Sequence, residues 1–108
     1  MPAYMFVRVK IRDSKRFAEY AKAVEQLVPI YGGRYLARGP VAAVLEGSFD
    51  AEERTLLAEY PSVEHIHSLW NSLEYSQIRK LREGAGEAHV IVIDGDRGMA
   101  PVSQKKRM

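Results

Sequence analysis

The chain has 108 residues, 46% of them hydrophobic and 28% charged, and this size and composition fit a single globular domain. It contains no cysteine, so disulfide scaffolds, thiol catalysis, thiolate zinc sites and iron–sulfur clusters are excluded. The net charge of +2 comes from the end of the chain: residues 95–108 carry four basic and one acidic side chain, whereas residues 1–94 sum to −1. We therefore expect a folded domain over residues 1–94 and a basic C-terminal arm over residues 95–108.

No apolar run approaches the ~18 residues that span a bilayer, and residues 1–4 lack the basic and apolar layout of a signal peptide. We expect a soluble, cytoplasmic protein without a membrane partner. A nucleic-acid partner is not expected either, because the folded part is slightly acidic. The three cations Lys105, Lys106 and Arg107 alone would give only weak, salt-sensitive attachment.

The first half of the chain predicts a strand followed by a helix. Residues 4–11 alternate between two parities, which is typical of a strand. Asp13 is placed to cap a helix over residues 14–31, where apolar side chains repeat at 3.6-residue spacing. Pro29 should kink the last turn of this helix, and the pair Gly32 and Gly33 should end it.

Two extended pieces follow, at residues 34–38 and 41–46, separated by Gly39 and Pro40. They predict one bent strand or, as an alternative, a short hairpin. Residues 54–60 are the next strand, which Pro61 closes.

The second half predicts a helix from the cap Ser62, with inward-facing Val63, Ile66, Trp70 and Leu73. A break is expected near residues 71–72, and the helix then continues to Gly84. Residues 87–94 form the last strand.

The resulting order of elements predicts an α+β fold, a ferredoxin-like βαββαβ sandwich with an antiparallel sheet and both helices on one face. The strands are apolar on both parities: Tyr4 and Phe6 point opposite to Val7, and Ile91 points opposite to Val92. Because two helices cover only one face, the other would expose a large apolar patch. We therefore expect a homodimer joined through the helix-free sheet faces.

Several motifs together resemble a known family of small proteins of unknown function, DUF1330. They are residues 31–39 (Tyr-Gly-Gly-Arg-Tyr-Leu-Ala-Arg-Gly), residues 44–47, residues 59–62, Trp70 and the pair Glu74 and Tyr75. The resemblance covers residues 2–94. It implies a dimeric α/β barrel, whose superfamily includes cofactor-independent monooxygenases, muconolactone isomerases and haem-degrading enzymes.

The common catalytic patterns are missing. His65 and His67 are two residues apart, which places them about 200° apart around a helix, and His89 is isolated on a strand, so we expect no metal. The glycines lack the spacing of a dinucleotide-binding loop, and no Gly-x-Ser-x-Gly frame is present, so we expect no cofactor and no acyl transfer.

One polar and aromatic group remains as a candidate ligand site between the sheet and the second helix. Its members are Arg34, Tyr35, Arg38, His67, Trp70 and Tyr75. Arginine offers a two-pronged donor to carboxylates and aromatic rings offer flat apolar walls, so the partner expected here is a small anionic or aromatic molecule, such as an organic acid. His67 is the one weak catalytic candidate, because histidine titrates near neutral pH.

Each of these residues also has a structural interpretation. Trp70 and Tyr75 occupy core positions of a helix. Arg34 and Arg38 share one strand parity and can pair with Glu46 or Glu59 across strands, whereas Arg8, on the proposed dimer face, calls for a partner such as Glu59. Two functions remain open: a small-molecule-binding protein, with or without cofactor-independent oxygenase or isomerase activity, and a non-catalytic structural or interaction module.

Overall fold

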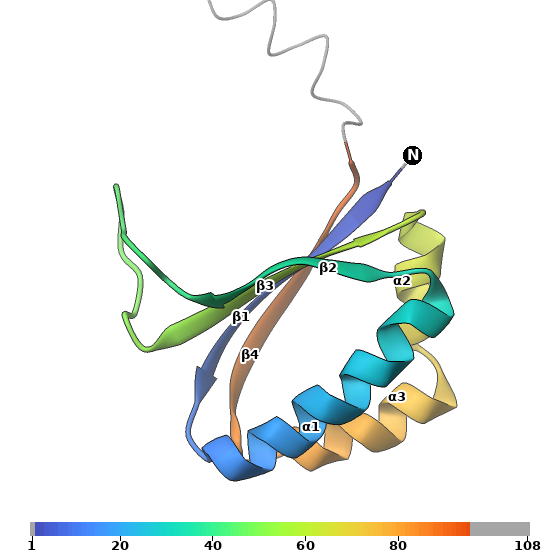
Figure 1. Cartoon of the computed structure of the whole chain (residues 1–108), viewed down its shortest axis with the longest axis horizontal. Coiled ribbons are helices and arrows are strands. Elements are labelled where there is room, and N and C mark those ends of the chain that lie inside the picture. The colour runs from blue at the N-terminus through green and yellow to red at the C-terminus, as the bar shows by residue number, and fades with distance from the viewer. Residues whose placement is uncertain (1, 96–108) are drawn as a thin grey trace, which may run out of the picture.

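The computed structural model describes residues 2–95. Its elements are β1 (Ala3–Ile11), α1 (Ser14–Leu27), the 3₁₀ helix η1 (Val28–Tyr31), β2 (Arg34–Pro40), β3 (Glu53–Tyr60), α2 (Val63–Trp70), α3 (Leu73–Ile78), the 3₁₀ helix η2 (Arg79–Arg82) and β4 (Gly86–Ile93). The strands form one antiparallel sheet in the order β2-β3-β1-β4, and the helices lie on one side of it (Figure 1). This is the predicted ferredoxin-like α+β fold.

The expected capping residues begin the helices. The side chain of Asp13 accepts a hydrogen bond from the Arg16 amide, and Ser62 does the same for the amide of His65. The expected disruption by Pro29 is present as a change from α to 3₁₀ helix at Val28. Gly32, in a left-handed conformation (φ 81°), ends η1. The break at residues 71–72 is also present: Ser72 caps the short helix α3.

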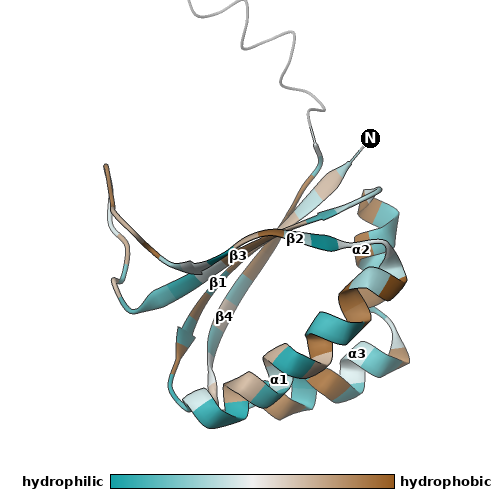
Figure 2. Ribbon diagram, in the orientation of Figure 1, coloured by the Kyte–Doolittle hydropathy of each residue, from teal (hydrophilic) through white to brown (hydrophobic). Residues whose placement is uncertain are grey.

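The sheet has two different faces. The inner face lies toward the helices and carries Met5, Val7, Leu56 and Ala58, which pack with Ile66 and other buried residues into the core. The outer face carries the opposite parity. Side chains of different strands on this face are adjacent in register: Phe6 pairs with Leu57 on one side and with Ile91 on the other. Figure 2 shows the apolar stretches of the central strands.

Two sequence predictions were wrong. Residues 41–46 form no strand, because β3 begins only at Glu53 and the chain beyond Pro40 has no neighbour with which to pair. This segment instead belongs to a connection that projects from the sheet (Figure 1). Leu73 was expected inside but is 73% exposed, because the break before α3 shifts the helical phase, and Leu69 is buried instead. The predicted C-terminal arm, apart from Gly95, lies outside the described residues.

Candidate functional site

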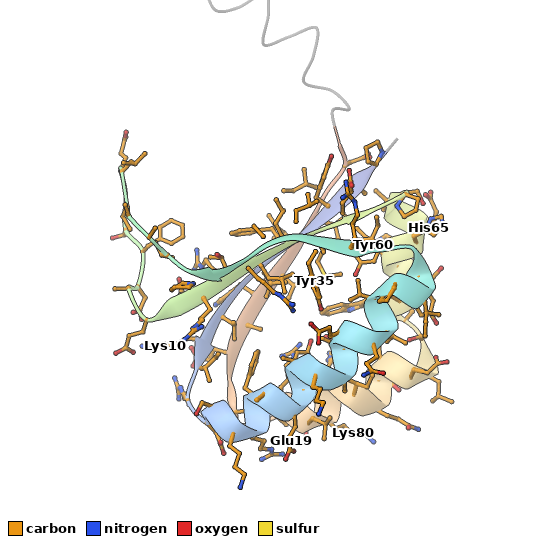
Figure 3. All side chains as sticks on the ribbon, in the orientation of Figure 1. Lys10, Glu19, Tyr35, Tyr60, His65 and Lys80 are labelled. Atoms are coloured by element: carbon orange, nitrogen blue, oxygen red, sulfur yellow. The ribbon has the colours of Figure 1, made fainter. Side chains whose placement is uncertain are left out.

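A partly open cavity of about 480 Å³ lies between the inner face of the sheet and the helices. Most of its wall is apolar and aromatic, contributed by β1, α1, β3, α2 and β4, with Val7, Val24, Leu56, Trp70 and Val90 among the lining residues. Tyr35 of β2 points from the sheet toward the helices, and Tyr60 lies near α2 (Figure 3). The volume falls within the range of sites for small organic molecules.

The charged side chains that line this cavity are all arginines: Arg38, Arg54 and Arg82. No aspartate, glutamate, histidine or lysine is among the described lining residues. Arg54 has no ion pair within residues 2–95, and neither has Arg82. An apolar cavity with this charge pattern favours an anion over a cation or a neutral molecule.

Arg38 reaches the cavity because β2 is bulged. The register of β2 against β3 shifts between Tyr35 and Ala37. As a result, Tyr35 lies opposite Ala58 and Arg38 lies opposite Leu56, so both side chains are on the inner face. The guanidinium carbon of Arg38 lies 4.4 Å from the centre of the Tyr35 ring, and one nitrogen lies 2.8 Å from a carboxylate oxygen of Glu25 on α1. One acidic residue therefore already compensates this cation.

A second polar group lies at the helical wall. The hydroxyl oxygens of Tyr20 and Tyr75 are 2.8 Å apart, and the ring centres of Trp70 and Tyr75 are 5.0 Å apart. Burial, together with the neighbouring phenol of Tyr75, raises the pKa of Tyr20 well above its ordinary value of 10.0. Tyr20 therefore stays protonated at neutral pH and acts as a hydrogen-bond donor or acceptor, not as a base.

Arg82, from η2, completes this group. Its guanidinium carbon lies 5.3 Å from the centre of the Tyr20 ring, beside the hydroxyls of both tyrosines. Its Nε atom is buried and has no hydrogen-bond partner within the described residues.

The structure brings four of the six predicted site residues to the cavity: Tyr35, Arg38, Trp70 and Tyr75. It does not bring Arg34 there. The bulge breaks the parity that Arg34 and Arg38 were expected to share, so Arg34 lies on the outer face, where it pairs with Glu59 at 2.8 Å. His67, the weak catalytic candidate, is exposed on α2 and is not among the lining residues.

Arg8 also differs from expectation in its partner. Its side chain pairs with Glu53 at 3.1 Å, not with Glu59, and the ring of Phe49 lies 5.2 Å from its guanidinium carbon. Glu59 is occupied by Arg34 and by the hydroxyl of Tyr4. The expected structural ion pair on the outer face is therefore present with another carboxylate.

Sequence reasoning missed Tyr20, Arg54 and Arg82. Tyr20 belongs to the apolar stripe of α1, and its hydroxyl group was the one feature in the sequence that could have indicated a polar role. Arg82 follows Leu81 in a basic segment near the end of the helical region, and such a cation ordinarily faces water. No group of three or more residues able to bind a metal ion is found in the described part of the chain.

Comparison with known families matches the model described as "Domain of unknown function (DUF1330)" over residues 2–96. The chain belongs to the DUF1330 family. A comparison with curated proteins finds no match. None of the helices within residues 2–95 has the length and apolar character needed to cross a membrane.

Solved structures share the fold of this DUF1330 chain. A protein of unknown function from Rhodopseudomonas palustris is 22% identical, with a TM-score of 0.73 over 86% of this chain and 81% of that one. A dimeric ferredoxin-like protein of unknown function from Jannaschia sp. CCS1 is 11% identical, with a TM-score of 0.67 over 87% and 99%. SnoaB, a cofactor-independent oxygenase from Streptomyces nogalater, is 5% identical, with a TM-score of 0.57 over 91% and 96%. These identities establish a common fold alone.

Proposed function

We propose that this DUF1330 protein binds a small organic acid with a flat apolar body in the cavity between the sheet and the helices. One observation carries the proposal: the cavity wall is apolar and aromatic, and its charged members are three arginines. A carboxylate satisfies guanidinium groups in a fixed geometry, and an aromatic body fills the space beside Trp70 and Tyr75. The lack of a carboxylate or histidine among the described lining residues favours binding over acid–base catalysis.

The test is a thermal-shift and calorimetric screen with benzoate, phenylacetate and naphthoate, each compared with the corresponding neutral alcohol. A ligand that binds only the native state raises the melting temperature. We expect the acids to raise it more than the alcohols. Arg38→Ala should weaken binding more than His67→Ala, because Arg38 lines the cavity and His67 does not. If none of the three acids stabilises the protein, the proposal is wrong.

The same acids serve to test for turnover. SnoaB shares the fold, so the bound acid is incubated aerobically, and oxygen uptake and product formation are followed. The proposal expects the acid to be recovered unchanged. Conversion that requires the intact cavity would replace a binding function with cofactor-independent oxygenation or isomerisation.

We also propose that the chain forms a homodimer through the outer sheet faces. Ile91 and Ile93 on this face are 56% and 41% exposed, and Leu36 in the bulge of β2 is 42% exposed. Together with the half-buried Phe6 and Leu57, Ile91 and Ile93 form an apolar row across β3, β1 and β4. A monomer seldom leaves such a patch uncovered, and the related structure from Jannaschia is described as dimeric. Light scattering at micromolar concentration should give twice the chain mass, and a stable monomer would contradict the proposal.

A further inference from the structure

Two buried hydrogen-bond donors of the cavity lack an acceptor. One is the Nε–H of Arg82: its guanidinium group is within hydrogen-bonding reach of the hydroxyls of Tyr20 and Tyr75, but the Nε atom itself has no hydrogen-bond partner within residues 2–95. The other lies in the tyrosine pair. Each phenol carries a single hydrogen, so whichever of Tyr20 and Tyr75 donates across their 2.8 Å contact, the other keeps a hydrogen to donate elsewhere. Buried donors without acceptors cost free energy, and a ligand that supplies oxygen acceptors removes that cost.

The charge of Arg82 is also uncompensated, and in this respect Arg82 differs from the other two arginines of the cavity. Arg38 pairs with Glu25, and Arg54 is exposed to solvent, where water and salt screen its charge. Arg82 is half-buried against Tyr20 and forms no ion pair with a described residue. In this less polar environment an anion gains more from one guanidinium than it would at the exposed edge.

We propose that Tyr20, Tyr75 and Arg82 form the anion subsite of the cavity, and that the ligand is a monocarboxylic acid whose aromatic ring lies beside Trp70. This inference rests on the proposed function and assigns the orientation of the ligand within it. The guanidinium group of Arg82 and the free phenol hydrogen donate to the carboxylate oxygens. Trp70, whose ring is next to that of Tyr75, supplies the flat wall for the ligand ring.

The ligand class follows from the donor set. The subsite offers donors and a single positive charge, and the described lining residues offer no carboxylate to an amine. The aromatic and apolar wall beyond the subsite excludes strongly hydrated groups at the other end of the ligand. A flat aromatic acid therefore fits better than a sugar acid, a polyphosphate or an amino acid.

The experiment measures the affinity of naphthoate and of naphthylmethanol by calorimetry for the wild type, Arg82→Gln and Tyr20→Phe. Arg79→Gln is the matched control: Arg79 comes from the same 3₁₀ helix and lies 5.2 Å from the Trp70 ring centre, but it does not line the cavity. Removing a charge-assisted hydrogen bond should weaken naphthoate about tenfold to a hundredfold in Arg82→Gln. Tyr20→Phe should weaken it about threefold to tenfold, and both changes should leave naphthylmethanol within about twofold.

A second readout locates the ligand. Trp70 is the one tryptophan of the chain, so its indole N–H gives a single nuclear magnetic resonance signal, which naphthoate should shift. If Arg82→Gln lowers the melting temperature too far for calorimetry, Tyr20→Phe keeps the ring and carries the test. Equal naphthoate affinity in the wild type, Arg82→Gln and Tyr20→Phe, or an equal loss in Arg79→Gln, overturns the subsite while the proposed function stands. If the wild type binds none of the acids, both are overturned.

Discussion

On the outer face of the sheet, Arg8, Lys10 and Arg34 each have a carboxylate oxygen within 2.8–3.1 Å, whereas on the cavity side Arg54 and Arg82 have no ion pair with a described residue. The difference agrees with the two uses proposed for these faces. A surface that packs against another apolar surface must neutralise its own charges first, because burying an unpaired ion is costly. A surface that binds a charged ligand leaves its charge available.

The largest expected effect comes from placing an unpaired charge on the outer face. Ile91→Glu should weaken the homodimer about a hundredfold or more, because two copies of a carboxylate would be buried without a partner at the proposed interface. Ile91 is 56% exposed in one protomer, so the fold itself should tolerate the change. Analytical ultracentrifugation measures the dissociation constant. Leu73→Glu, at a 73% exposed position on α3, is the control and should leave the dimer intact.

The burial of Tyr60 on the inner side of the sheet should be measurable as a loss of stability at alkaline pH. Burial, followed by the neighbouring phenols of Tyr35 and Tyr75, raises the pKa of Tyr60 from 10.0 to about 12. The folded state therefore holds this proton more tightly than the unfolded state. The stabilisation is fully present below about pH 10 and is lost as the pH rises toward 12, by roughly 2–3 kcal/mol in total. Urea unfolding across this range should show a shallower loss in Tyr60→Phe, and parallel curves for the two proteins would contradict the assignment.

A smaller effect is expected from converting a paired arginine into an unpaired one. Glu25→Gln removes the carboxylate that lies 2.8 Å from Arg38 at the cavity. Naphthoate should then bind about twofold to fivefold more tightly, with a gain that shrinks at high salt because both side chains are half exposed. Calorimetry at two salt concentrations measures this. An affinity that falls instead would mean that the ion pair shapes the cavity more than it competes for the cation.

The smallest effect is expected at Arg34. Its guanidinium side chain is 72% exposed, and a surface ion pair of this kind contributes about 0–1 kcal/mol. Arg34→Gln should therefore change the free energy of unfolding by less than about 1 kcal/mol and leave naphthoate affinity unaltered. A clear loss of naphthoate binding would return Arg34 to the site, as the sequence had predicted.

The sequence predicted the fold well because hydrophobic periodicity and capping residues act locally. The alternation of residues 4–11, the caps Asp13 and Ser62, and the break near residue 71 all appear in the structure. Strand 41–46 failed because a strand depends on a partner that local composition does not reveal.

The site was predicted only in part, for similar reasons. A single bulge in β2 separated Arg34 from Arg38, and strand parity offers no sign of a bulge. Arg82 lies in a basic segment whose residues ordinarily face water. It contacts Tyr20 only because α1 and η2 pack together in the fold. Contacts between side chains distant in sequence form the proposed anion subsite of this cavity, and these are the contacts that periodicity cannot describe.

The bulge in β2 also has a consequence for how this chain is compared with its relatives. Two residues, Leu36 and Ala37, stand between Tyr35 and Arg38, where a regular strand needs only one to keep both side chains on the same face. A relative with a straight second strand and the same cavity would therefore carry its tyrosine and arginine one position closer together. A correct alignment then contains a single-residue gap inside a strand, and an ungapped alignment anchored on the tyrosines would pair Arg38 with a residue from the opposite face of the relative's sheet.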